Sequence, residues 1–253
     1  MTIFHYDKTF EGLLTAVFDA YNRKTFPDRL LETNEPEPLF VDESFTVTTD
    51  EEKSGRVWKA LEKKLDRNTQ NMITYVWLSE LKGSDELIFR YIRKTIDSKH
   101  SIETNFADDD VLQMQKLAQK VNKERQRLIE LVRFQKAADD IFFAPVSPDH
   151  NSLPLTLDHF KDRFADQKWI IYDTKRNYGF YYDQKTVTEM TLDSTNLFPE
   201  GKLDENLMAE DEKLYQELWK GYFKSMTIKE RINLKLQRQH MPKRYWKYLT
   251  EKQ

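Results

Sequence analysis

The sequence predicts an α+β protein that is mostly helical, with a small antiparallel sheet and two strand-helix units at the N-terminus. Charged residues make up 33% of the chain and only six residues are glycine, which is typical of a helix-rich surface. Apolar residues recur at helical spacing over long stretches. In contrast, residues 169–192 contain short runs of β-branched and aromatic side chains, which favour strands.

The first 65 residues contain the two strand-helix units. Residues 2–6 alternate like a short strand, and apolar residues at helical spacing follow over 10–21, behind the possible N-cap Thr9. Three prolines within residues 24–38 predict a loop. Residues 39–47 are then rich in strand-forming side chains, and a second helix follows them.

Capping and spacing predict the later helices. Thr49-Asp50-Glu51-Glu52 forms a capping box ahead of the second helix, which carries Val57, Leu61 and Leu65. Further helices are expected over residues 71–81, 84–96, 108–138, 156–164, 206–225 and 227–240. Pro242 can open one last helical turn. The long helix over 108–138 is expected to be the spine of the fold.

A breaker-rich segment over residues 144–154 ends the long helix, and three strands follow the short helix after it. Residues 169–173, 178–182 and 187–192 are separated by turn-forming residues, which predicts an antiparallel meander. Because no linker of flexible composition divides the chain, we expect one domain over residues 1–253, with 105–108 as the place of a possible subdivision.

Composition excludes several classes of chemistry. The absence of cysteine excludes disulfides, thiolate nucleophiles, zinc–thiolate sites and cysteine-ligated iron–sulfur clusters. The sequence contains no phosphate-cradling glycine-rich loop, paired-histidine zinc motif or serine elbow, so we expect no cofactor and no metal. The N-terminus lacks a secretory signal, and no uncharged stretch of 18 residues could span a bilayer. We therefore expect a cytoplasmic protein with no membrane partner.

Charge is distributed unevenly along a nearly neutral chain. The net charge is −3, from 40 basic and 43 acidic residues. Residues 220–253 hold ten basic and two acidic side chains, a balance of +8, so the remainder carries −11. Such asymmetry indicates a localised anion-binding face on an otherwise acidic protein.

The last residues of the chain interleave cations with aromatic rings behind a proline that can start a helix. The cations suit backbone phosphates, and the rings, Tyr248 included, offer faces on which an unpaired base could stack. The candidate nucleic-acid contacts are His240, Lys243, Arg244, Tyr245, Trp246 and Lys247. The alternative is a terminal helix whose aromatic residues dock into the core and whose lysines face water.

The candidate catalytic and phosphate-binding residues form patterns that are less specific than the known catalytic motifs. His159 and Arg163 lie four residues apart, so one helix face would hold an acid/base and a fixed cation. Asp173 and Arg176 lie at the turn after the first meander strand, where a plain connector needs similar residues. Arg133 falls within an apolar run, where an unpaired guanidinium would be costly, so a partner or a phosphate is expected.

These patterns define the candidate site. His159 and Asp173 are the candidate catalytic residues, and the candidate phosphate-binding residues are Arg133, Arg163 and Arg176. His150 and His159 match no specific metal-ligand spacing. Glu124 and Arg127 lie at helical spacing with Arg133, which an ion-paired outer face explains as well as a substrate groove does.

Several blocks of the sequence together resemble a known family. They are Phe10-Glu11-Gly12-Leu13-Leu14 with Ala16 and Tyr21, Thr48 to Asp50, Arg127 with Arg133-Phe134, Pro148-Asp149-His150-Asn151, His159-Phe160 with Arg163, Trp169-Ile170-Ile171-Tyr172-Asp173 with Arg176, and His240-Met241-Pro242-Lys243-Arg244-Tyr245-Trp246. Over nearly its full length the chain resembles the bacterial family called probable DNA metabolism proteins, whose core is a domain of unknown function. Gln126 and Leu131 depart from the family pattern, which has a histidine and a phenylalanine there.

The resemblance implies a part in DNA modification or repair, beside a companion radical SAM protein. Some relatives also carry a fused uracil-DNA glycosylase-like domain. This chain stops directly after the basic aromatic block, so we expect neither that domain nor glycosylase activity. The absence of cysteine agrees with a companion that holds the iron–sulfur cluster.

The sequence leaves three functions open. The first is a DNA-binding accessory subunit that presents DNA to a radical SAM partner. The second is an enzyme acting on DNA or a nucleotide, with His159 as acid/base, Asp173 orienting it, and the three candidate arginines holding phosphate. The third is a protein-binding adaptor. Convergence of the candidate side chains around one cleft would favour the enzyme.

Overall fold

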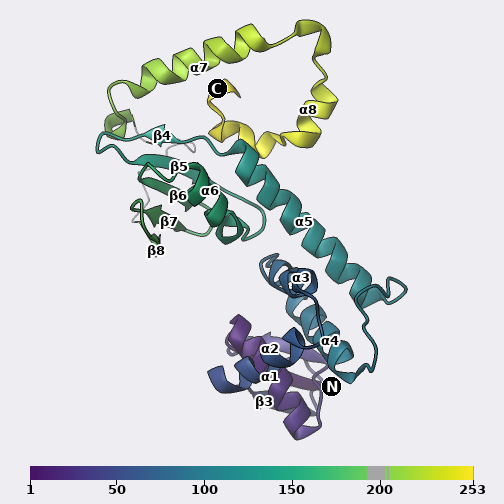
Figure 1. Cartoon of the computed structure of the whole chain (residues 1–253). Coiled ribbons are helices and arrows are strands. Elements are labelled where there is room, and N and C mark those ends of the chain that lie inside the picture. The colour runs from purple at the N-terminus through teal and green to yellow at the C-terminus, as the bar shows by residue number, and fades with distance from the viewer. Residues whose placement is uncertain (193–202, 204, 253) are drawn as a thin grey trace. The chain divides into compact units, whose positions relative to one another are not determined.

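The computed structural model describes residues 1–192, 203 and 205–252 (Figure 1). It divides into two compact units, Met1–Asn122 and Lys123–Gln253, and the division falls within the long helix α5 (Asp109–Leu131), beyond the 105–108 segment. That the chain is one domain stays a prediction, because compactness does not show which parts fold together. Each unit combines helices with its own sheet, so the fold class is α+β, as the sequence predicts.

The N-terminal unit is built on a three-stranded parallel sheet in the order β2-β1-β3. Its elements are β1 (Thr2–Tyr6), α1 (Phe10–Arg23), β2 (Arg29–Glu32), β3 (Glu43–Thr46), α2 (Glu51–Glu62), α3 (Arg67–Trp77) and α4 (Ser84–Asp97). The two strand-helix units are confirmed. The expectation that residues 24–38 form only a loop is wrong, because Leu30 and Leu31 are buried in β2 in a run too short to show a period.

Capping residues explain where the first two helices begin. Thr9 caps α1, as expected, and its hydroxyl accepts a hydrogen bond from the amide of Gly12. In α2 the cap is Asp50, whose carboxylate accepts from the amides of Glu52 and Lys53. The apolar faces of α1, α2, α3 and α4 pack with β1 into a hydrophobic core.

The C-terminal unit contains a five-stranded mixed sheet in the order β4-β5-β6-β7-β8. The strands are β4 (Gln135–Lys136), β5 (Phe142–Val146), β6 (Trp169–Asp173), β7 (Tyr178–Tyr182) and β8 (Val187–Met190). β6, β7 and β8 pair antiparallel, which confirms the meander. β5 and β6 pair in parallel, and the chain between them forms η1 (Leu153–Thr156) and α6 (Leu157–Arg163).

β4 and β5 correct the interpretation of residues 132–146. The long helix ends at Leu131 instead of near Ala138, and residues 144–146, expected to break structure, belong to β5. Pro145 is tolerated there because β4 pairs only with Phe142 and Phe143. At Pro145 the side of β5 that faces β4 has no pairing strand. The absence of an amide hydrogen in Pro145 therefore costs no hydrogen bond with β4.

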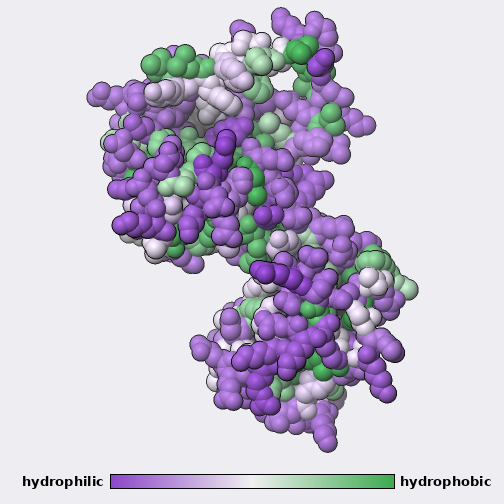
Figure 2. Space-filling model, in the orientation of Figure 1, coloured by the Kyte–Doolittle hydropathy of each residue, from purple (hydrophilic) through white to green (hydrophobic). Residues whose placement is uncertain are grey.

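The segment that we call the arm, residues 212–243, lies C-terminal to the sheet. It contains α7 (Glu212–Met226), η4 (Lys229–Arg231) and α8 (Leu234–His240), so the helices expected over 206–225 and 227–240 are present but shorter. The short helices η5 (Lys243–Tyr248) and η6 (Thr250–Lys252) follow. Figure 1 shows α7 and α8 along an arch, and Figure 2 shows apolar and hydrophilic surface interleaved on it.

Two helical glycines test the packing around β1. A Cβ added to Gly12 would overlap Asp7 and lie 2.8 Å from Thr49 Oγ1, whereas one on Gly55 meets nothing within 4 Å. Asp7 is held by hydrogen bonds from Thr9 and Thr49. Gly12→Ala should therefore lower the free energy of unfolding by about 2 kcal/mol in urea titrations, and Gly55→Ala should raise it by about 1 kcal/mol. Equal effects of the two substitutions would contradict this packing.

Candidate nucleic-acid interface

A buried carboxylate, Glu124 on α5, organises the C-terminal unit. It accepts hydrogen bonds from the amides of Asp149 at 3.0 Å and His150 at 2.8 Å. The hydroxyl of Tyr245 donates to it at 2.8 Å and the guanidinium of Arg244 at 2.5 Å. Burial alone would raise the pKa of Glu124, but the four donors together outweigh it and hold the pKa below its ordinary value.

These contacts hold the side chains of Arg244 and Tyr245 against α5, although Arg244 remains partly exposed. Tyr245 is 4% exposed, so its ring offers no face to an unpaired base. Arg244 also pairs with Asp149 at 2.8 Å, so two carboxylates compensate its charge. That Arg244 and Tyr245 contact nucleic acid stays a prediction, and these contacts argue against it, because both side chains hold the C-terminal segment against Glu124.

The other rings of this segment are docked as well. The indole N–H of half-buried Trp246 donates to the Met241 carbonyl at 2.9 Å, and Lys252 lies 5.2 Å from the Trp246 ring centroid. Tyr248 is buried, with the ammonium of Lys247 at 4.7 Å from its ring. The structure thus shows the alternative in which the terminal aromatic residues dock into the core and the lysines face water.

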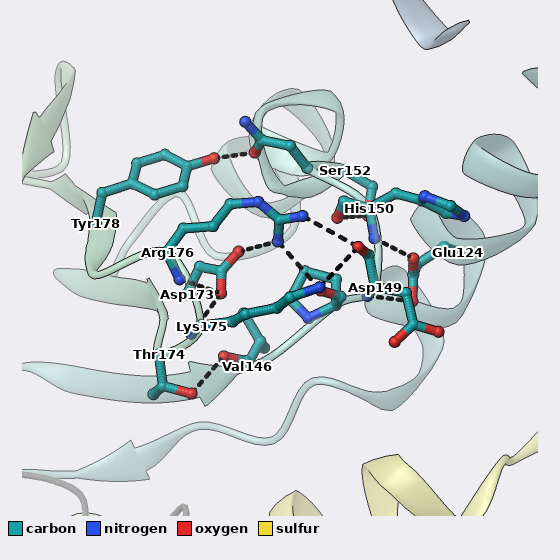
Figure 3. Close-up of polar contacts among 12 residues, drawn as sticks. Glu124, Val146, Asp149, His150, Ser152, Asp173, Thr174, Lys175, Arg176 and Tyr178 are labelled. Carbon is teal, nitrogen blue, oxygen red and sulfur yellow. Dashed lines mark hydrogen bonds and ion pairs between the residues drawn. The ribbon is translucent and has the colours of Figure 1, made fainter. Parts of the chain in front are cut away.

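The loop over residues 148–151 is held from two sides (Figure 3). Arg176 donates to the carbonyls of Pro148 and Asp149, each at 3.1 Å, and Lys175 donates to the Asp149 carbonyl at 3.0 Å. Asp173 is fully buried and pairs with Arg176 at 2.8 Å. Arg176 therefore supports the loop from the β6–β7 turn, while the buried carboxylate on α5 holds it from the other side.

The two candidate catalytic residues, His159 and Asp173, make separate contacts. His159 is exposed on α6, and its ring packs edge-on against Phe160. Asp173 directs its carboxylate to Arg176 and to the amide of Lys175. No hydrogen bond joins His159 to Asp173 among the described residues, so the structure shows no contact through which Asp173 would orient His159.

Residues 1–192, 203 and 205–252 contain neither a metal-binding cluster of acidic and histidine side chains nor a membrane-spanning helix. In these ranges no three His, Asp or Glu side chains gather in a way that could hold a metal ion. Within the same ranges, none of the helices combines the length and the apolar composition needed to cross a bilayer.

Two of the three candidate phosphate-binding residues line one cavity of about 700 Å³, formed within the C-terminal unit by Arg133, Arg163 and their neighbours. Arg133 has the partner that its apolar surroundings require, since its Nη2 lies 2.9 Å from the buried carboxylate of Glu251. Arg163 is exposed, and it forms no ion pair within the described part of the chain. Of these two arginines, Arg163 is the one left to meet an anion.

Uncompensated positive charge gathers on the arm, within the basic stretch 220–253 but mostly ahead of the nucleic-acid contacts predicted over 240–247. Between residues 220 and 243 the chain has seven cations and one carboxylate, Glu230. All seven are exposed, and none forms an ion pair with another described residue. They are Lys220, Lys224, Lys229, Arg231, Lys235, Arg238 and Lys243. His240 is exposed in the same stretch. The arm, which includes the predicted contacts Lys243 and His240, is therefore the surface suited to a polyanion.

Glu124 has a central role that its spacing in the sequence does not predict. Its spacing from Arg127 and Arg133 suggests a solvated, ion-paired helix face. However, it follows Val121 by three residues and precedes Leu128 by four, and both are buried, so it falls within the apolar stripe of α5. A carboxylate in an apolar stripe needs donors, and this is the signal that could have identified it.

Comparison with known proteins identifies a family. Residues 82–251, more than half of the chain, match the family described as a domain of unknown function (DUF4130). No curated protein matches the sequence. One similar solved structure is described as "pGpG-specific phosphodiesterase - PggH from Vibrio cholrae", with 9% identity and a TM-score of 0.34, over 89% of this chain and 99% of that one. A likeness at this score bears on neither the fold nor the activity of this chain.

Removing the Glu124 carboxylate should destabilise the C-terminal unit. Glu124→Ala leaves the buried Tyr245 hydroxyl and two loop amides without their acceptor and removes one of the two carboxylates that pair with Arg244. We therefore expect the free energy of unfolding at pH 7 to fall by about 3 kcal/mol in urea titrations. The control Glu130→Ala removes an exposed carboxylate from the same helix and should change little.

The same pair of variants has a defined pH dependence. Because the folded-state pKa of Glu124 lies below its ordinary value of 4.5, its stabilisation is present above that pH and is lost as the pH falls through the folded-state pKa. The difference between wild type and Glu124→Ala should therefore shrink on acidification. A difference that grows at low pH would show that the carboxylate is not held by these donors.

Proposed function

The chain belongs to the DUF4130 family, and we propose that it is a nucleic-acid-binding protein whose arm holds the phosphate backbone. The observation that carries this proposal is the run of seven exposed cations between residues 220 and 243 without carboxylate partners among the described residues. Such cations bind polyphosphates by releasing the counterions condensed on them. Elsewhere in the C-terminal unit Arg133, Arg176 and Arg244 are already compensated by carboxylates.

In this proposal the protein binds DNA and takes part in DNA modification or repair. Both are supported by the resemblance to probable DNA metabolism proteins. The chain would act as an accessory subunit that presents DNA to a radical SAM partner. That partner would supply the iron–sulfur cluster for which this chain has no cysteine ligands.

Exposed apolar side chains on the arm support the partner in this proposal. Leu214, Leu218 and Met226 are 57%, 59% and 64% exposed, and Ile232 and Leu236 are similarly open. Aliphatic side chains cannot stack on bases, and a group of them facing water favours a protein partner. We therefore assign the apolar side of α7 to the radical SAM partner and the cations to DNA.

Charge removal on the arm should weaken DNA binding in a salt-dependent way. In Lys224→Gln/Lys235→Gln/Arg238→Gln, up to three phosphate contacts are lost, so the slope of log affinity against log salt should flatten by about 2 to 3. Fluorescence anisotropy with a labelled duplex measures both affinity and slope. The control Lys59→Gln/Lys63→Gln/Lys82→Gln removes equal charge from exposed positions of the N-terminal unit. If both triple variants behave alike, the arm is not the binding surface.

Docking of the partner should depend on the apolar side of α7. Leu218→Glu/Met226→Glu places two carboxylates there, and we expect affinity for the purified radical SAM companion to fall by at least about tenfold in calorimetry. The control Leu39→Glu/Phe40→Glu makes the same change at positions that are 94% and 85% exposed in the N-terminal unit. Unchanged affinity of the α7 variant for the companion would show that the companion does not bind this surface.

A further inference from the structure

The cavity that Arg133 and Arg163 line has the size of a small-molecule site. Its volume is about 700 Å³, and ligand pockets usually measure about 300 to 1,000 Å³. Its walls come from the start of the sheet, from the end of α6, from α7 and from Thr250 of η6, all within the C-terminal unit. No residue of the docked segment 244–248 lines it. The cavity is therefore separate from the contacts around Glu124.

Aromatic rings make up much of the cavity wall. Phe134 and Phe164 pack against each other with ring centroids 5.0 Å apart. From α7, Tyr215 and Trp219 lie four residues apart on one helix face and are 59% and 39% exposed. The indole N–H of Trp219 donates to Glu251 at 3.0 Å, which fixes the orientation of its ring. The wall thus offers partly exposed rings, of which Trp219 is held in one orientation, and such rings suit stacking on a flat ligand.

The polar groups of the cavity leave one cation available. Arg133 is compensated by Glu251, and Lys136 is compensated by Asp140 at 3.0 Å and by Asp211, which also lines the cavity, at 3.9 Å. Arg163 has no ion pair among the described residues. The side-chain amide of Gln216 donates to Glu212 at 2.9 Å, so its oxygen remains an acceptor. A ligand that matches this wall has a flat heteroaromatic ring with a hydrogen-bonding edge and carries an anion.

We propose that this cavity binds a single nucleotide, with the base against Tyr215 and Trp219 and the phosphate on Arg163. The assignment rests on the proposed function, in which the arm binds nucleic acid. It adds a second site, which binds one unpaired nucleotide. A paired base cannot use the cavity, because its faces are stacked within the duplex. The shared chemistry is a nucleoside phosphate, free in solution or extruded from a strand.

Calorimetry with three small probes tests the assignment on the full chain. We expect dTMP to bind, and thymidine and inorganic phosphate to bind at least about tenfold more weakly. Thymidine lacks the phosphate that would contact Arg163, and inorganic phosphate lacks the base that would stack on the rings. Arg163→Gln should lower dTMP affinity about tenfold, as loss of one charge-assisted hydrogen bond does. Tyr215→Leu should weaken dTMP and thymidine alike. The control Lys161→Gln removes an exposed cation from the same helix outside the cavity and should change nothing.

A second pair of probes separates the two sources of the nucleotide. A duplex with one bulged nucleotide should bind more tightly than the fully paired duplex, and Arg163→Gln should abolish that difference. Binding of dTMP without a preference for the bulge assigns the cavity to free nucleotides. The inference is overturned if Arg163→Gln matches wild type with both dTMP and the bulged duplex. In that case the arm variants still report separately on the proposed function, through affinity for the paired duplex.

Discussion

The C-terminal unit depends on one buried charge, the carboxylate of Glu124. A carboxylate removed from water is tolerated only when donors replace its hydration, and here two amides, a hydroxyl and a guanidinium do so. The donors belong to the 148–151 loop and to the C-terminal segment, which have little regular structure of their own. One ionised group therefore fixes both parts of the chain against α5.

This arrangement also sorts the positive charge of the unit into two kinds. Arg244 and Arg176 pair with carboxylates, and Arg176 also donates hydrogen bonds to backbone carbonyls. These contacts stabilise the loop and the C-terminal segment. The cations of the arm have no such partners among the described residues, and they share the arm with exposed apolar side chains. An amphipathic surface of this kind suits a protein that joins a polyanion to a second protein. Arg163, next to open rings, adds a place for a single anionic base.

The sequence predicts the parts of this structure that depend on local signals. Spacing and caps, such as Thr9, identify the helices, and β-branched and aromatic runs identify the meander. Strands β2, β4 and β5 are not predicted, because pairing with other segments of the chain stabilises them. In β5, Pro145 considered without its pairing partners indicates the end of regular structure. The same holds for the site. The pattern around Arg244 and Tyr245 predicts rings and cations but not their exposure, because their acceptor, Glu124, lies 120 residues before Arg244.

The most direct test is hydrogen exchange measured by mass spectrometry, with and without a DNA duplex. If the arm binds DNA while the C-terminal segment is structural, amides of residues 244–250 exchange slowly in the free protein and do not change on addition of DNA, whereas peptides within 212–243 gain protection. The opposite pattern, with fast exchange of residues 244–250 in the free protein and protection by DNA confined to them, would contradict the account.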